Sequence, residues 1–163
     1  MKKYLRAVLA CFLLLCTLSG CKVFNKRMPL NGDITFYDIS LTVDEKYVRD
    51  SFQSSENLWV FEYGNYKEYI ILSKKDISGD LTVVLSEYLE YMLENGVNAE
   101  KKVFFENEAI FSSWTSDGLF CQEVTFVHEG SVYAVSLRGG TESEFDHLIR
   151  TVMKLQANAE SNV

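Results

Sequence analysis

The sequence predicts an α+β fold in which an antiparallel β-sheet of about six to seven strands is flanked by two amphipathic α-helices. Segments rich in β-branched and aromatic residues recur along the chain, and short turn-forming gaps separate them. Two other segments repeat their apolar residues with a helical period. The chain has 163 residues, of which 47% are hydrophobic and 24% charged. This composition suits one globular domain and excludes a disordered chain.

The first strands are expected before residue 74. Residues 34–43 are dense in β-branched and aromatic residues, and apolar side chains alternate with polar ones from residue 37 to residue 43, which predicts a single half-buried strand. Aromatic and β-branched residues then fill residues 57–63 and 67–73. The turn-forming pair Gly64-Asn65 lies between these two runs, so we expect them to form a β-hairpin.

The period changes to that of a helix between residues 81 and 95. Ser78 or Asp80 is expected to cap the helix N-terminus, and Asn95-Gly96 is expected to end it. The apolar residues fall on one helical face: Leu81, Val84, Leu85, Tyr88 and Met92.

The remainder of the chain predicts four strands and a closing helix. Short turns separate the strand-like runs, which favours antiparallel neighbours. The runs cover residues 100–105, 109–115, 119–128 and 132–138. Thr141 and Glu144 then have the spacing of a capping box, and Phe145, Leu148, Ile149 and Val152 mark the apolar face of a helix over residues 145–155.

The N-terminal 20 residues have the pattern of a secretory signal. Lys2, Lys3 and Arg6 precede an unbroken apolar run over residues 7–16. A membrane-spanning helix needs about 20 apolar residues, so this run is shorter than such a helix requires. We therefore expect residues 1–20 to be a signal peptide.

The segment Leu18-Ser19-Gly20-Cys21 resembles the lipobox of bacterial lipoproteins. The resemblance implies cleavage before Cys21 and lipidation of that cysteine, with acyl chains such as palmitate. An ordinary cleaved signal and an uncleaved anchor remain the alternatives. Residues 21–33 would then form the lipidated cysteine and a tether, residues 34–156 the domain, and residues 157–163 a polar tail.

The lipobox resemblance also implies a location. The domain would be held at the cell membrane or the outer membrane by its N-terminal lipid, on the extracytoplasmic side. Stable attachment needs more than one acyl chain, because a single chain binds a membrane only marginally.

Removal of the signal would change the charge and the cysteine content. Three of the 16 Lys and Arg residues lie in residues 1–20, which leaves 13 basic against 23 acidic residues and a net charge of −10. Nucleic acid is therefore excluded as an expected partner, whereas an envelope protein or a basic peptide would suit the acidic surface. Cys121 would be the one unmodified cysteine left, so no intramolecular disulfide is expected.

The order of elements resembles the PsbP/DcrB-like family. The features that carry this resemblance are the runs Ile34–Val43, Trp59–Tyr63, Leu81–Asn95, Lys102–Arg138 and Phe145–Leu155. The resemblance implies a single antiparallel sheet flanked by helices, and a role in binding or accessory assembly. It supplies no catalytic residues. The chain departs from the family pattern at Val43-Asp44-Glu45, where a proline-containing turn is usual.

Three side chains are candidates for chemistry. A metal site or a cysteine nucleophile using Cys121, His128 and His147 is conceivable, but no paired spacing supports it. Cys121 is more simply a small buried strand residue, and the histidines exposed or half-exposed side chains. We therefore expect no metal, no cofactor and no enzymatic activity.

The aromatic residues give the remaining functional signal. Trp59, Phe61 and Tyr63 share one face of a strand, where core packing is the simpler interpretation and a partner surface the sharper one. The leading functional hypothesis is a non-catalytic binding or accessory module of the cell envelope. The alternatives are a small-ligand-binding accessory of an envelope transporter or sensor and, less favoured, a small hydrolase using Cys121 or His128.

Overall fold

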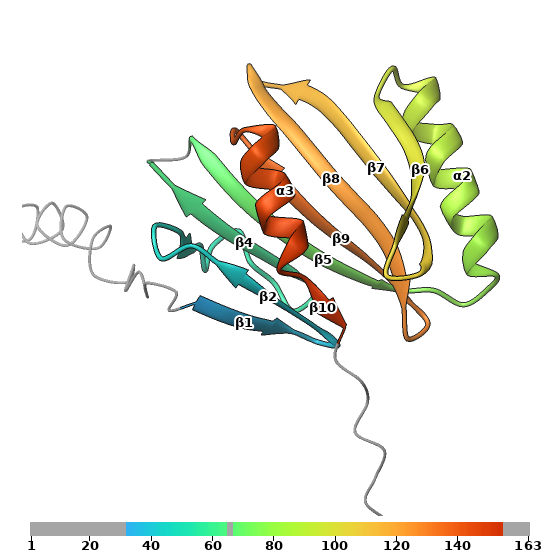
Figure 1. Cartoon of the computed structure of the whole chain (residues 1–163), viewed down its shortest axis with the longest axis horizontal. Helices are drawn as coiled ribbons and strands as arrows, with labels where there is room; N and C mark the ends of the chain where they lie inside the picture. Colours follow the sequence, from blue (N-terminus) through green and yellow to red (C-terminus); the bar gives the residue numbers. More distant parts are fainter. Residues whose placement is uncertain (1–31, 65–66, 155–163) are drawn as a thin grey trace, which may run out of the picture.

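A computed structural model describes residues 32–64 and 67–154 and shows two antiparallel sheets with two helices (Figure 1). The large sheet has seven strands in the order β3-β4-β5-β9-β8-β7-β6, and the small sheet has the order β1-β2-β10. The elements are β1 (Gly32–Phe36), β2 (Ile39–Val43), β3 (Val48–Arg49), β4 (Leu58–Tyr63), β5 (Glu68–Asp76), α2 (Leu81–Glu94), β6 (Asn98–Phe104), β7 (Asn107–Ser116), β8 (Leu119–His128), β9 (Ser131–Arg138), α3 (Glu142–Arg150) and β10 (Met153–Lys154). The α+β fold class is confirmed.

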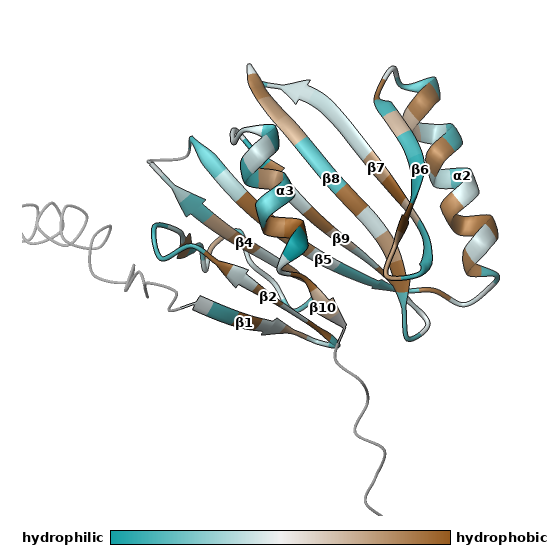
Figure 2. Ribbon diagram, in the orientation of Figure 1, coloured by the Kyte–Doolittle hydropathy of each residue, from teal (hydrophilic) through white to brown (hydrophobic). Residues whose placement is uncertain are grey.

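The hydrophobic core lies on one face of the large sheet, which we call the core face. Strand alternation turns every second side chain of β4, β5, β8 and β9 toward this face. The small sheet and α3 cover it (Figure 1). Along β8, hydrophobic runs of residues are separated by a hydrophilic run (Figure 2). The largest fully buried side chains of this core are Tyr133, Phe36, Phe61, Phe126, Ile39, Leu41 and Leu72.

Helix α2 lies on the opposite face of the large sheet, which we call the α2 face. It contacts β6 and β7, and it buries Leu85 and Met92. The Asp80 side chain accepts a hydrogen bond from the Thr82 backbone N–H, so Asp80 rather than Ser78 is the N-cap. The predicted helix over residues 81–95 is confirmed, and its C-cap is Asn95.

The prediction of a single strand over residues 34–43 is wrong. The chain reverses at Tyr37 and Asp38, and β1 and β2 pair antiparallel with Phe36 opposite Ile39. Tyr37 adopts a left-handed conformation, with a φ of +53°. Because neither glycine nor proline occurs in this turn, the sequence does not indicate the reversal. The Tyr37 hydroxyl donates to the Asn57 side chain at 2.7 Å, so a contact 20 residues away holds the turn.

The closing helix also ends earlier than the expected Leu155. It stops at Arg150, and Thr151 is its C-cap. The Thr151 hydroxyl donates to the carbonyl of Leu148 at 2.7 Å and accepts from the backbone N–H of Thr42 at 3.1 Å. The chain then pairs with β2 as β10, because the edge of β2 offers unpaired backbone groups there.

Candidate functional site

The three aromatic residues of β4 have different environments. They point to the core face, as the sequence predicts, but Phe61 is 0% exposed and belongs to the core. Its interpretation as part of a partner surface is therefore wrong. Trp59 is half-buried and Tyr63 is 42% exposed. These two side chains lie beside two separate hollows in the surface.

The larger hollow, which we call the Trp59 hollow, has a volume of about 660 Å³. This volume is in the range of small-molecule sites, about 300–1,000 Å³. The hollow is lined by Tyr37, Arg49, Ser51, Ser54, Ser55, Glu56 and Trp59. The Arg49 guanidinium carbon lies 3.9 Å from the centroid of the Trp59 ring, which is a cation–π stack.

Packing beneath Trp59 fixes the orientation of its ring. The ring makes edge contacts with Phe36 at 5.0 Å and with Phe61 at 6.4 Å between centroids. Arg49 stands on β3, whose short pairing with β4 places it next to Phe61. The hollow thus presents a preorganised aromatic ring with a cation on it, and such Trp, Tyr and Arg side chains dominate binding energy at protein interfaces.

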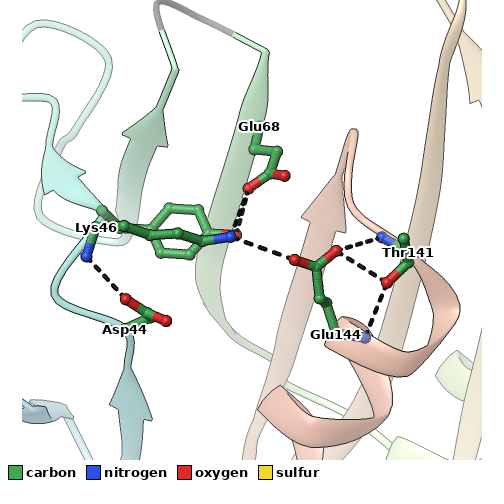
Figure 3. Close-up of polar contacts among 6 residues, drawn as sticks. Asp44, Lys46, Glu68, Thr141 and Glu144 are labelled. Atoms are coloured by element: carbon green, nitrogen blue, oxygen red, sulfur yellow. Dashed lines mark hydrogen bonds and ion pairs between the residues drawn. The ribbon is translucent and has the colours of Figure 1, made fainter.

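The second hollow adjoins an ion-pair cluster that we call the Lys46 cluster: Lys46, Tyr47, Tyr63, Glu68 and Glu144. Lys46 Nζ lies 3.1 Å from Glu68 Oε2 and 3.3 Å from Glu144 Oε1 (Figure 3). The same ammonium lies 5.1 Å from the centroid of the Tyr47 ring and 4.8 Å from that of Tyr63. The Tyr47 hydroxyl donates to Glu68 at 3.0 Å.

The Lys46 cluster joins three elements of the fold. Lys46 lies in the loop after β2, Glu68 begins β5, and Glu144 belongs to the first turn of α3. Glu144 also completes the predicted capping box, because its carboxylate accepts from the Thr141 backbone N–H at 2.8 Å. A cleft of about 280 Å³ opens beside the cluster, and His147 is among its lining residues.

The protonation states of Lys46, Tyr47 and Glu144 stay fixed at neutral pH. Burial alone would lower the pKa of Lys46, but the hydrogen bonds that its ammonium donates to Glu68 and Glu144, and the charges of these two residues, raise it. Burial and the Glu68 charge raise the pKa of Tyr47 well above its usual range. Backbone and side-chain hydrogen bonds from Thr141 lower the pKa of Glu144. Lys46 therefore stays an ammonium, Tyr47 a neutral phenol and Glu144 a carboxylate.

The three candidates for chemistry do not converge. Cys121 is 2% exposed on the α2 face of β8, as a small buried strand residue should be. His128 is half-buried at the far end of the same strand, seven residues and about 23 Å away. His147 is exposed on α3, over the core face. Burial raises the pKa of the Cys121 thiol, which disfavours the nucleophilic thiolate.

The described residues show neither a metal-binding group nor a membrane-spanning helix. No three His, Cys, Asp or Glu side chains within 32–64 and 67–154 are grouped so as to hold a metal ion. In these same ranges, neither helix has the length and apolar character needed to cross a membrane.

The lipobox lies outside the described residues. Leu18, Ser19, Gly20 and Cys21 all precede Gly32, the first described residue, so cleavage and lipidation stay predictions. The polar tail over residues 157–163 is outside the described ranges too.

Comparison with solved structures decides the fold type. A protein of known crystal structure from Bacteroides thetaiotaomicron VPI-5482 matches with a TM-score of 0.54 and 11% identity, over 80% of this chain and 50% of that one. The solution structure of cyanobacterial PsbP (CyanoP) from Synechocystis sp. PCC 6803 matches with a TM-score of 0.53 and 11% identity, over 82% of this chain and 97% of that one. The fold is PsbP-like. No protein-family model and no curated protein match the chain.

In the PsbP-like fold, contacts between different elements form both hollows, and sequence patterns do not indicate these contacts. Sequence patterns single out Trp59 and Tyr63, but they give no role to Arg49 or Lys46. Arg49 reaches Trp59 only through the two-residue strand β3, and Lys46 reaches its partners only once α3 packs on the sheet. The capping-box residue Glu144 was the one local signal of the Lys46 cluster.

Proposed function

We propose that this chain is a membrane-anchored extracytoplasmic lipoprotein and that its PsbP-like domain is a non-catalytic binding module of the cell envelope. The lipobox resemblance at Cys21 supports the anchor, and the ten residues 22–31 between that cysteine and β1 could span at most about 36 Å when fully extended. Its partner is an envelope protein with a basic surface, which complements the net charge of −10 expected after signal cleavage.

The Trp59 hollow carries this proposal. It combines a tryptophan ring held by the core, a stacked arginine and a tyrosine in a concave surface of about 660 Å³. Such a surface can receive a side chain or loop of a protein partner with little loss of conformational entropy. Three serines and Glu56 supply polar groups around the aromatic residues.

The pKa shifts support a binding role over acid–base catalysis. A general acid or base works best when its pKa lies near the working pH. Among the described residues, eight side chains have clearly shifted pKa values, and every shift leads away from neutral pH: Lys46, Tyr47, Tyr88, Cys121 and Tyr133 upward, and Asp76, Asp80 and Glu144 downward.

Membrane fractionation of cells that produce wild type or Cys21→Ala tests the anchor. Wild type should label with radioactive palmitate and fractionate with the membrane, whereas Cys21→Ala should take up no label and keep residues 1–20. Ser19→Thr, a mild change in the same motif, is the matched control and should still label. Processing and fractionation of Cys21→Ala like those of wild type would remove the lipoprotein assignment.

Site-specific photocrosslinking in intact cells tests the partner surface. A crosslinker at Ser55, in the Trp59 hollow, should yield a specific adduct that Trp59→Ala and Arg49→Ala abolish and that weakens as salt is raised. Tyr91→Ala is the control, because Tyr91 is an exposed aromatic residue on α2. An adduct unaffected by Trp59→Ala would exclude the hollow as the binding surface.

A second candidate function is a small-ligand-binding accessory of an envelope transporter or sensor. The observation that favours it is a cavity of about 300 Å³ between α2 and the large sheet.

A further inference from the structure

The cavity beneath α2 lies on the α2 face, away from the Trp59 hollow and the Lys46 cluster. Helix α2 packs over β6 and β7 at one side of the large sheet (Figure 1). It therefore leaves part of β5, β9 and β8 uncovered. The cavity is lined by Ser73, Lys75, Ile77, Val84, Leu85, Tyr88, Glu123, Thr125, Val132 and Ala134, and its volume of about 300 Å³ is at the lower end for small-molecule sites.

Glu123 is the polar centre of this cavity, and three hydroxyl groups hold its carboxylate. Tyr88 donates to Oε1 at 2.8 Å, Thr125 donates to Oε1 at 3.0 Å, and Ser136 donates to Oε2 at 2.6 Å. These donors come from α2, β8 and β9, so the packing of three elements fixes the carboxylate. Burial raises the pKa of Tyr88, which keeps its hydroxyl available as a donor.

The negative charge of Glu123 has no cationic partner. Among the described residues, no Lys, Arg or His forms an ion pair with Glu123. Thr125 is 4% exposed and Ser136 is 8% exposed, so two of the three donors are shielded from water, and the third, Tyr88, is half-buried. A carboxylate with neutral donors only, facing a cavity, favours a ligand that brings a positive charge.

Lys75 supplies the opposite charge at the mouth of the same cavity. It is exposed on β5, and within the described part of the chain it forms no ion pair. Its neighbour Lys74 points to the core face instead, where it pairs with Asp76 at 3.0 Å. The cavity thus has a fixed anion inside and an unpaired cation at its opening.

Aliphatic side chains form the walls between these two charges. Leu85 and Val84 come from α2, and Val132 and Ala134 come from β9. Ala134 is small, and it lies directly opposite Thr125 on β8 and Ser73 on β5. The walls therefore suit a short hydrocarbon body, while the polar groups fix its orientation.

We propose that this α2 cavity binds a small zwitterion, with an ammonium group on Glu123, a short aliphatic body against Val84, Leu85, Val132 and Ala134, and an acidic group facing Lys75. The inference rests on the second candidate function, small-ligand binding in this cavity, and it depends on neither the lipid anchor nor the Trp59 hollow. An experiment that disproved the lipid anchor or the Trp59 hollow would therefore leave ligand binding in the α2 cavity still to be tested.

Calorimetric titration of the full-length protein in detergent micelles tests the site, with 6-aminohexanoate as the probe. Binding should be measurable below about 10 mM, the weak end of specific affinities. Pentylammonium should bind more weakly, and hexanoate should not bind. Nuclear Overhauser contacts from the probe methylenes to methyl groups of Val84, Leu85 and Ala134 should locate it in the cavity.

Three variants with a matched control sharpen the test. Glu123→Gln should weaken binding of the probe at least tenfold, because it removes the charged acceptor and keeps the side-chain shape. Lys75→Met should weaken binding of 6-aminohexanoate a few-fold and leave that of pentylammonium unchanged. Ala134→Leu should fill the cavity and abolish binding. Lys74→Met, which removes the same charge from the other face of β5, should bind like wild type.

Each outcome of these titrations either supports the proposed site or overturns it. Loss of binding in Ala134→Leu with retention in Lys74→Met would support the site even if Glu123→Gln failed to fold. No heat and no probe contacts in wild type up to about 10 mM would overturn the proposal. Equal affinity of wild type and Ala134→Leu would overturn it too, as would tighter binding of hexanoate than of the ammonium probes.

Discussion

The ammonium of Lys46 lies 3.1 Å from the carboxylate of Glu68 and links the loop after the small sheet to the first residue of β5. Because Glu144 of α3 binds the same ammonium, one lysine connects the small sheet, the large sheet and the helix that covers the core.

Lys46→Met should lower the free energy of unfolding by about 1 kcal/mol, because a three-element ion-pair cluster is lost but partial solvent exposure screens it. The Lys46 side chain is 29% exposed, and that of Glu144 is 42% exposed. Urea unfolding measures the change. Lys102→Met is the control, because the ion pair between Lys102 and Glu100 is exposed on both sides and should contribute less. Equal losses in the two variants would show that the cluster has no special stabilising role.

Glu144 should make stability fall in acid. Its pKa is lowered from 4.5 in the folded state, so its contribution is present above pH 4.5 and is lost as pH falls through the folded pKa. The free energy of unfolding of Glu144→Gln should therefore depend less on pH below pH 4.5 than that of wild type. Thermal unfolding at several pH values measures this difference. Parallel pH profiles for the two proteins would contradict the assignment.

Gly139→Ala should destabilise the fold much more than Gly118→Ala. Both glycines have a positive φ, +84° and +76°, so alanine strains either turn by about 1–2 kcal/mol. A Cβ at Gly139 would also overlap the carbonyl oxygen of Lys67, whereas a Cβ at Gly118 meets open space. We expect a loss of about 3 kcal/mol or more for Gly139→Ala in urea unfolding, because overpacking adds to the strain. Equal losses would disprove the close approach.

Cys121 should react slowly with iodoacetamide at pH 8. Burial raises the pKa of its thiol, and only 2% of the residue is exposed, so little accessible thiolate is present. The alkylation rate, followed by mass spectrometry, should rise at least about 100-fold on unfolding in guanidinium chloride. Cys121→Ala gives the background. A folded-state rate close to the unfolded rate would indicate a reactive cysteine and revive the hydrolase hypothesis.

Local sequence patterns predicted the elements whose structure depends on neighbouring residues. The apolar period from Leu81 to Met92 gave the α2 helix, and the capping box of Thr141 and Glu144 gave the start of α3. The hairpins of β7, β8 and β9 followed from alternating residues and short turns. These features form within a few residues, so propensity and period suffice to find them.

The candidate sites were predictable only in part. Trp59 and Tyr63 were found from the aromatic alternation of β4, but the same alternation also selected Phe61, which the small sheet and α3 bury. A strand pattern shows which side chains share a face, and it does not show what covers that face. No local sequence pattern identifies Lys46, Arg49 or the hydroxyl groups around Glu123, because their partners lie on other elements.

The sequence by itself determined the α+β class, α2, the start of α3 and the hairpins that follow α2, since each depends on backbone hydrogen bonding and apolar periodicity over short range. It also carries the lipobox resemblance at Cys21, which no tertiary contact is needed to recognise. Tertiary structure decided the reversal at Tyr37, the pairing of β10 with β2, and the places of the Trp59 hollow, the Lys46 cluster and the α2 cavity. Each of these depends on contacts between residues far apart in the chain, and only the packing of the two sheets and helices brings those residues together.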